Sequence, residues 1–139
     1  MSDTAQRILA DYGTVAVVGL SSNPDKTAHA VPAFLQSAWW RVIPVHPSAT
    51  ELLGEPAYAS LSDVPDQVEV VEVFRPADEA PGIAEQAVAV GAKALWLQQG
   101  LVSAEARRIA EDAGLLYVED RCMGKLAALW GIHHHEADH

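Results

Sequence analysis

The 139-residue chain contains a single cysteine, Cys122, and this scarcity excludes an intrachain disulfide. It also excludes a structural zinc site built on pairs of cysteines. No apolar run approaches the roughly 18 residues that a membrane span requires. The first residues, Met1–Gln6, lack the basic and apolar regions of a signal peptide. We therefore expect a cytoplasmic protein with no membrane partner.

Basic residues are also few, because nine Lys and Arg stand against nineteen Asp and Glu, giving a formal net charge of -10. Such a chain repels the phosphate backbone of nucleic acids, so we expect no nucleic-acid partner. A small polyanion remains a suitable ligand if the few cations converge on one site. Four cations fall near the ends of predicted strands, namely Lys26, Arg75, Arg121 and Lys125.

Strand and helix periodicities alternate along the chain, which predicts one α/β domain at residues 1–132 and a His-rich tail at 133–139. The predicted strands cover residues 15–20, 40–45, 68–74, 94–97 and 115–119, and the predicted helices cover 4–12, 27–37, 77–90 and 103–113. Residues 52–58 form a loop or a short strand in this interpretation. The pattern predicts a Rossmann-like, doubly wound, parallel five-stranded sheet in the order 3-2-1-4-5, with helices on both faces.

The turn after the first predicted strand lacks the further glycines of known nucleotide loops. After Gly19 the sequence reads Leu-Ser-Ser-Asn-Pro-Asp-Lys-Thr, which matches neither G-x-G-x-x-G nor the Walker loop. The free N–H groups and dipole of the following helix still favour a phosphate, and Gly19 would let the ligand approach the backbone. In the alternative interpretation the turn binds nothing, and Ser21, Ser22 or Thr27 only cap the helix.

The second predicted strand ends without a carboxylate, since Val45, His46 and Pro47 occupy that position. A classical NAD site has an Asp or Glu there to bind the ribose hydroxyls. A ligand with a phosphate on its ribose would tolerate a histidine, which leaves NADP or coenzyme A. The short turn suits coenzyme A better, but the residues alone do not separate the two ligands.

Five segments in order carry a resemblance, namely VAVVGLSSNPDK, RVIPVHP, VEVFRP, ALWLQQG and EDRCM. From residue 8 to 122 the chain resembles the small CoA-binding proteins of the YccU-like family, which are similar to the CoA-binding domain of the succinyl-CoA synthetase alpha subunit. The resemblance implies coenzyme A or an acyl-CoA as the ligand. The chain departs from the family pattern at His46, where members usually carry asparagine, and after Cys122, where Glu-His is frequent.

The resemblance also implies a set of site residues at the carboxyl ends of the strands. Phosphate would be held by Gly19, Leu20, Ser21, Ser22, Lys26 and Thr27; adenosine would lie between Val45, His46 and Pro47; Phe74 and Arg75 would cover the adenine or reach a phosphate; Gln98 and Arg121 complete the set. In the alternative interpretation Lys26 is a solvated lysine and Arg75 pairs with Glu72 or Asp78. We assign no catalytic residue and no metal ligand.

Two classes of function remain open at this point. The first is a non-catalytic module that binds CoA or acyl-CoA, in which Cys122 could form a mixed disulfide with the CoA thiol. The second is an oxidoreductase that uses NAD(P), or a nucleotide-binding subunit of a larger complex. Synthetase activity is not expected, because the family's phosphohistidine belongs to another domain. Modules of this size often dimerise, so a homodimer is also open.

Overall fold

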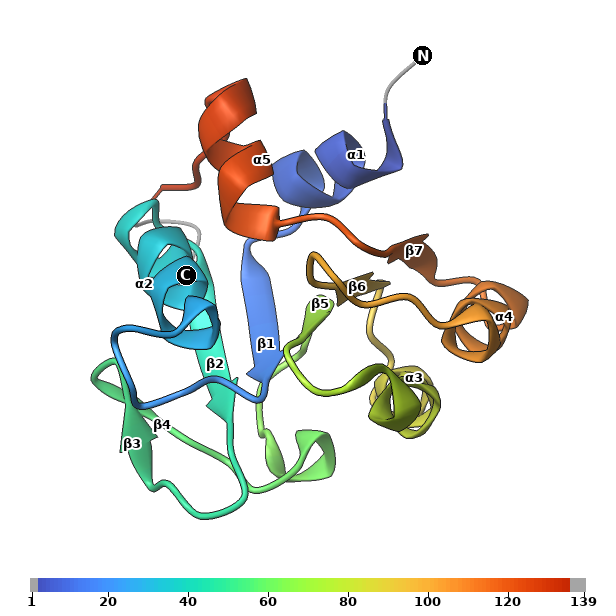
Figure 1. Cartoon of the computed structure of the whole chain (residues 1–139), viewed down its shortest axis with the longest axis horizontal. Helices are drawn as coiled ribbons and strands as arrows, with labels where there is room; N and C mark the ends of the chain where they lie inside the picture. Colours follow the sequence, from blue (N-terminus) through green and yellow to red (C-terminus); the bar gives the residue numbers. More distant parts are fainter. Residues whose placement is uncertain (1–2, 136–139) are drawn as a thin grey trace.

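A parallel five-stranded sheet lies at the centre of the computed structural model, which describes residues 3–135 (Figure 1). In their order across the sheet the strands are β2 (Arg41–Val45), β1 (Thr14–Val18), β5 (Val70–Val73), β6 (Ala94–Leu97) and β7 (Leu116–Val118). The helices are α1 (Thr4–Asp11), α2 (Thr27–Ser37), α3 (Ala80–Ala89), α4 (Ala104–Asp112) and α5 (Met123–Trp130). Short pieces are the hairpin of β3 (Glu51–Leu52) and β4 (Glu55–Pro56) and the 3-10 turns η1 (Leu61–Asp63) and η2 (Ala77–Glu79).

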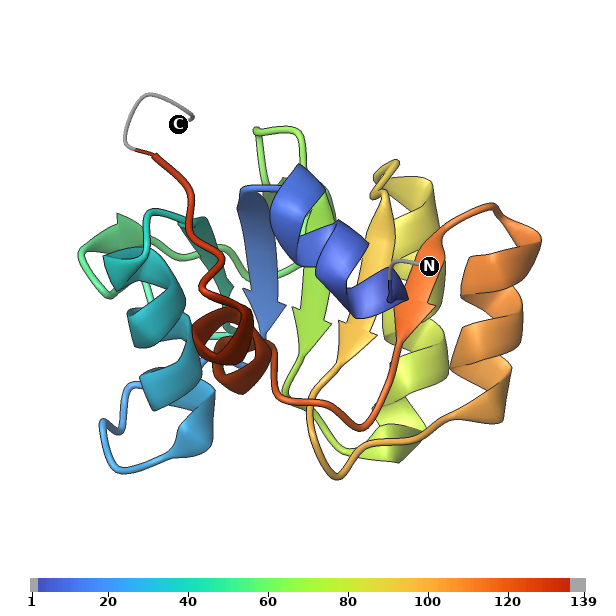
Figure 2. The ribbon, with the colours of Figure 1, turned by 90° about the horizontal axis from the view of Figure 1, so that it is seen from above.

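Helices cover both faces of the sheet, as Figure 2 shows. One face carries α1, α2 and α5 over a core that includes Leu35 and Met123. The opposite face carries α3 and α4 over a core that includes Ile83 and Ala110. Every residue of β5 and β6 is buried, which is typical of parallel strands covered on both sides. This doubly wound α/β architecture confirms the predicted fold class.

The strand order differs from the predicted 3-2-1-4-5, because β5, the third long strand, pairs with β1 and β6 instead of β2. The five long strands therefore follow the order 2-1-3-4-5. Pro44 in β2 gives a physical reason, since a proline lacks the N–H of a ladder and is tolerated at a sheet edge. The outer side of β2 receives Tyr58, whose N–H donates to the Pro44 carbonyl at 3.0 Å. The winding direction consequently changes between β1 and β5, where α/β folds of this kind place their ligands.

The predicted helices agree with the structure closely, with two corrections. Helix α2 spans the predicted residues 27–37, but its N-cap is Lys26, and no side chain, including that of Thr27, caps it. The predicted helix at 77–90 is divided into η2 and α3. Helix α5 has no counterpart in the sequence expectations. It matters for function, because it packs against α2 and forms one wall of a cavity described below.

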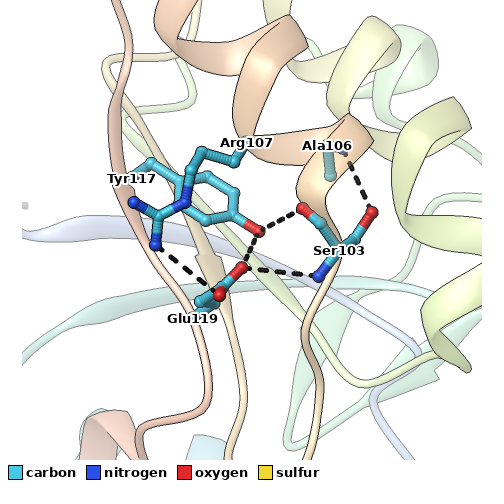
Figure 3. Close-up of polar contacts among 5 residues, drawn as sticks. All are labelled: Ser103, Ala106, Arg107, Tyr117 and Glu119. Carbon is cyan, nitrogen blue, oxygen red and sulfur yellow. Dashed lines mark hydrogen bonds and ion pairs between the residues drawn. The ribbon is translucent and has the colours of Figure 1, made fainter.

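A polar network ties the segment between β6 and α4 to the end of β7 (Figure 3). The Tyr117 hydroxyl donates to the Glu119 carboxylate at 2.8 Å, and the Ser103 N–H donates to the same oxygen at 3.4 Å. Ser103 also caps α4 by accepting from the Ala106 N–H at 3.1 Å. Arg107 lies over the Tyr117 ring and pairs with Glu119. Burial, followed by the bond to Glu119, raises the pKa of Tyr117. The network therefore fixes the loop that leaves β6.

The chain continues to pack against the rest of the domain after residue 132. The imidazole of His134 is buried, bonds to the Leu9 carbonyl at 2.8 Å and meets the Trp40 ring edge-on at 4.5 Å. The predicted His-rich tail is described as far as His135, and the rest of it, 136–139, lies outside the described residues. Within residues 3–135, no helix has the length and apolar character needed to cross a membrane.

Candidate functional site

Two cavities open at the carboxyl edge of the sheet, on either side of the segment that follows β5. The first, which we call the β1–β2 cavity, has a volume of about 570 Å³ and lies at the ends of β1 and β2. The second, which we call the α2–α5 cavity, has a volume of about 820 Å³ and lies between helices α2 and α5. Phe74 and Arg75 line both cavities. The two cavities therefore adjoin, and one elongated ligand can occupy both.

Most of the predicted phosphate and adenosine residues meet in the β1–β2 cavity. Its lining includes Gly19, Leu20, Ser21, Lys26, Val45, His46, Pro47, Phe74 and Arg75. Thr27 and Gln98 line the α2–α5 cavity instead. Ser22 and Arg121 line neither cavity. The Arg121 guanidinium pairs with Asp3 through two contacts of 3.0 Å and lies over Trp130, so it is directed toward the N-terminal helix.

The turn after β1 is fixed to the start of α2 by hydrogen bonds that sequence reasoning missed. The Ser21 N–H donates to the Ala28 carbonyl at 3.1 Å, and the Ser21 carbonyl lies 2.7 Å from Nδ1 of His29. The Ser21 hydroxyl accepts from the Asn23 N–H at 3.0 Å, so this side chain closes the turn rather than the helix end. The turn is thereby held in one position beside the first turn of α2.

Several polar groups around this turn have no partner among residues 3–135. The backbone N–H groups of Leu20, Thr27 and Ala28 donate to none of the described residues. The ammonium group of Lys26 forms no ion pair with any residue in the range 3–135. Free N–H groups at a helix N-terminus and a nearby cation together favour an anion. The turn therefore has the chemistry of a phosphate site.

His46 is held by the backbone that follows it. Its Nδ1 accepts from the N–H groups of Ser48 at 3.1 Å and Ala49 at 3.0 Å. Because Nδ1 acts as the acceptor, the ring hydrogen of the neutral form resides on Nε2. His46 lines the β1–β2 cavity, and its Nε2–H is a hydrogen-bond donor at the strand end where the sequence has no carboxylate.

Arg75 is engaged by a carboxylate, although not by either of the partners expected from the sequence. Its Nε and one terminal nitrogen bind the two carboxylate oxygens of Glu79 at 3.2 and 2.8 Å. The bond to Arg75 lowers the pKa of Glu79, and the same bond raises the pKa of Arg75. Glu79 also lines the β1–β2 cavity. The cavity consequently contains a carboxylate that competes with an anionic ligand for Arg75.

Gly19 is required by the protein's own backbone. Its φ of +94° lies in the left-handed region. A Cβ at this position would lie 2.9 Å from the Phe74 carbonyl oxygen and 2.9 Å from Cδ of Arg75. The close neighbour of Gly19 is therefore the segment that follows β5, so the fold itself needs a glycine at this position.

The α2–α5 cavity is mainly apolar, although Thr27, Arg75, Gln98, Gln99 and Lys125 contribute polar or charged groups to its lining. Its lining residues are Thr27, Ala30, Val31, Phe34, Phe74, Arg75, Pro76, Gln98, Gln99, Leu101, Cys122, Gly124, Lys125 and Ala128. Gln98 follows β6 and is 4% exposed, while Cys122, the residue before α5, is 6% exposed. Sequence reasoning missed the walls from α2 and α5. The spacing of Met123, Ala127 and Trp130, followed by Gly131, was an available signal for α5.

Glu72 is a buried carboxyl group below the site. It lies in β5 opposite Val17 and Trp96, and its side chain is fully buried. Neither carboxyl oxygen has a hydrogen-bond partner among residues 3–135. Burial raises the pKa of Glu72 to about 8, so the group is mostly neutral at pH 7. It does not pair with Arg75, which was one interpretation of the sequence.

Comparison with known proteins decides the family. Residues 13–128 match the family described as the CoA binding domain, and this span includes both cavities. The chain belongs to the CoA-binding domain family. Its relatives include the uncharacterized protein YneT of Bacillus subtilis, with 38% identity over 85% of this chain and 87% of YneT. A hypothetical protein from Pyrococcus horikoshii, whose structure is solved, has 36% identity and a TM-score of 0.87 over 90% of this chain and 88% of that protein.

A larger enzyme contains a region that is similar to this chain. The ADP-forming acetate–CoA ligase I of Archaeoglobus fulgidus is 25% identical over 81% of this chain. The matching region is 18% of the ligase, so this chain corresponds to one part of that enzyme. The similarity to a CoA-binding domain stated from the sequence is thereby confirmed.

Proposed function

We propose that this chain is a coenzyme A binding module, which holds CoA or an acyl-CoA across both cavities and performs no chemistry on it. One observation carries the proposal: the β1–β2 cavity, which is the more polar of the two, adjoins the mainly apolar α2–α5 cavity at Phe74 and Arg75. CoA has the same division, with phosphates and adenosine at one end and an uncharged pantetheine arm at the other. Membership of the CoA-binding domain family supports the same ligand.

In this proposal the diphosphate lies beside the turn at residues 19–22. The free N–H groups of Leu20, Thr27 and Ala28 and the ammonium group of Lys26 support this position. Hydrogen bonds that involve a charged partner contribute more than neutral ones. Ser22 and Arg121 line neither cavity, so the proposal gives neither residue a direct contact with the ligand.

The adenosine end lies between the β2 terminus and Phe74. Val45, His46 and Pro47 flank it, and Nε2–H of His46 is available to a ribose oxygen or to the ribose phosphate. Phe74 and Arg75 cover the adenine or reach a phosphate. A donor at this strand end suits a phosphorylated ribose, whereas an acidic residue there would repel it. The pantetheine arm then passes Phe74 toward Gln98 and Cys122.

Isothermal titration calorimetry of the ligand-stripped protein tests the proposal, with CoA, 3′-dephospho-CoA, NADP and NAD as parallel ligands. We expect saturable binding of CoA and weaker binding of dephospho-CoA. Lys26→Ala should weaken CoA binding by about tenfold, in line with the loss of one charged hydrogen bond. Lys93→Ala is the matched control, because Lys93 is exposed and directly precedes β6. It therefore lies at the amino ends of the strands, away from the carboxyl ends where the cavities open.

The outcomes separate the candidate ligands. Absence of CoA binding at millimolar concentration, or tighter binding of NADP, would overturn the proposal. Equal weakening by the two lysine variants would mean that only net charge matters. The phosphate would then not lie at the turn after β1.

A further inference from the structure

The apolar walls of the α2–α5 cavity are the strongest unexplained feature of the molecule. They are built by Ala30, Val31 and Phe34 of α2 and by Gly124 and Ala128 of α5. Phe34 is 40% exposed, so this large ring is only partly buried by the protein's own residues. At about 820 Å³ the cavity is also larger than the β1–β2 cavity. Its size and apolar character indicate an occupant that buries hydrocarbon.

Small residues on α5 create this space. At Gly124 the helices are close, because a Cβ there would lie 3.2 Å from Cγ1 of Val31 and 3.6 Å from Cδ2 of Phe34. Ala128 lies one turn further along the same face of α5, and it remains exposed. The two helices thus touch at Gly124, while the short side chains of Ala30 and Ala128 leave the groove open.

A free hydrogen-bond donor lies at the inner end of the groove. Oε1 of Gln98 accepts from the Met123 N–H at 3.4 Å, and Nε2 of Gln98 donates to no residue in the part of the chain that the structure describes. The Gln98 side chain is nevertheless 4% exposed and lines the cavity. This nitrogen is not sealed off from the cavity, so a ligand there can reach it. A carbonyl oxygen of the ligand would satisfy it.

We propose that the α2–α5 cavity binds the acyl chain of an acyl-CoA, with the Gln98 amide donating to the carbonyl oxygen of the thioester. The acyl chain lies between Phe34, Ala30 and Ala128, and the thioester lies beside Cys122. This inference rests on the proposed function, because a CoA moiety in the β1–β2 cavity brings its pantetheine arm past Phe74 to this point. The preferred ligands are therefore medium-chain acyl-CoA esters rather than free CoA.

A chain-length series tests the inference on the intact protein. CoA, acetyl-CoA, butanoyl-CoA, octanoyl-CoA and dodecanoyl-CoA are titrated calorimetrically under the same conditions. Each methylene that enters the groove should tighten binding by up to about fourfold, until the groove is full and the affinity becomes constant. Gln98→Leu, which keeps the volume and removes the donor, should weaken acyl-CoA binding by about fivefold or more.

Two variants, one in each helix that walls the cavity, test where the acyl chain lies. Ala128→Leu and Ala30→Leu should each lower octanoyl-CoA affinity at least tenfold, and circular dichroism identifies which of them keeps the native fold. Leu129→Ala is the matched control, because Leu129 is 74% exposed on α5 and does not line the cavity. It should leave the chain-length series unchanged.

The outcomes distinguish the inference from the proposed function. CoA binding with no dependence on acyl length would overturn the inference alone, since the cavity would then hold only the pantetheine arm. A length dependence that neither wall variant changes would also overturn it. A concentration-dependent dimer that buries Phe34 and excludes acyl-CoA would replace it with an interface. If neither CoA nor any of its esters bound to the protein, the proposed function would be overturned instead.

Discussion

Arg75 and Glu79 form a two-point ion pair at the rim of the β1–β2 cavity, although both side chains are nearly half exposed. The pair occupies the guanidinium that the proposed ligand would need. Ion pairs this exposed contribute little to stability, so a phosphate can replace Glu79 as the partner of Arg75. In the proposed complex, Glu79 would therefore compete with the ligand for Arg75.

Glu79→Gln should tighten CoA binding by about fivefold, because one negative charge leaves the cavity and Arg75 becomes free. Titration calorimetry of the variant and the wild type measures the change. Glu105→Gln is the control, because Glu105 faces Arg108 in another exposed pair on α4 and lines neither cavity. Weaker CoA binding by Glu79→Gln would show that the ligand needs Arg75 held in its present orientation.

Gly19→Ala should destabilise the fold by about 2–4 kcal/mol, because strain at positive φ combines with the contact to the Phe74 carbonyl. Urea unfolding followed by tryptophan fluorescence measures the loss. Gly100→Ala is closely matched, since Gly100 has a φ of +93° but no atom within 4 Å of its Cβ position. The control should lose only about 1–2 kcal/mol. Equal losses would mean that the end of β5 can move aside.

Glu72 should give the fold a pH dependence in the neutral range. Its pKa is about 8 in the native state and near its usual value of 4.5 when unfolded. The unfolded chain therefore releases this proton first. The associated stability is complete below about pH 4.5 and is lost as the pH rises through 8. The slope is about 1.4 kcal/mol per pH unit within that window.

Glu72→Gln removes this slope because an amide does not titrate. Urea midpoints at pH 5, 6, 7 and 8 for both proteins provide the measurement, and the difference between the two proteins isolates the contribution of Glu72. The lowered pKa values of Asp3 and Glu79 act below this window. Identical slopes in the two proteins would show that Glu72 is solvated and ionised in the native state.

The sequence was sufficient for the elements whose signals are local. The apolar spacing from Val31 to Leu35 predicts α2 with its observed bounds. Strand order depends on contacts between distant segments, and the only local signal was Pro44, which favours an edge position for β2. Helix α5 has neither a side-chain cap nor an acidic first turn, so it lacked the usual start signals.

The same difference between local signals and contacts between distant segments applies to the candidate site. The turn after β1 could be located from Gly19 and the pattern around it, since a strand, a turn and a helix follow one another there. The hydrogen bonds within the turn could not be predicted from the sequence, because the contact of His29 with Ser21 depends on how the turn folds back on α2. Arg121 was assigned to the site from its place after a strand. Its direction was set by Asp3, which is 118 residues away.

The last prediction concerns the end of the folded domain. We propose that it extends at least to His134, beyond the boundary at 132 inferred from composition. His134→Ala should cost about 1–3 kcal/mol, because the variant loses the bond to the Leu9 carbonyl and the packing of the ring against Trp40 and Gly13. His133→Ala is the matched control, since the neighbouring His133 is exposed, and it should change stability by less than about 0.5 kcal/mol. Urea unfolding of both variants measures the difference. Equal stability of the two variants would return the boundary to residue 132.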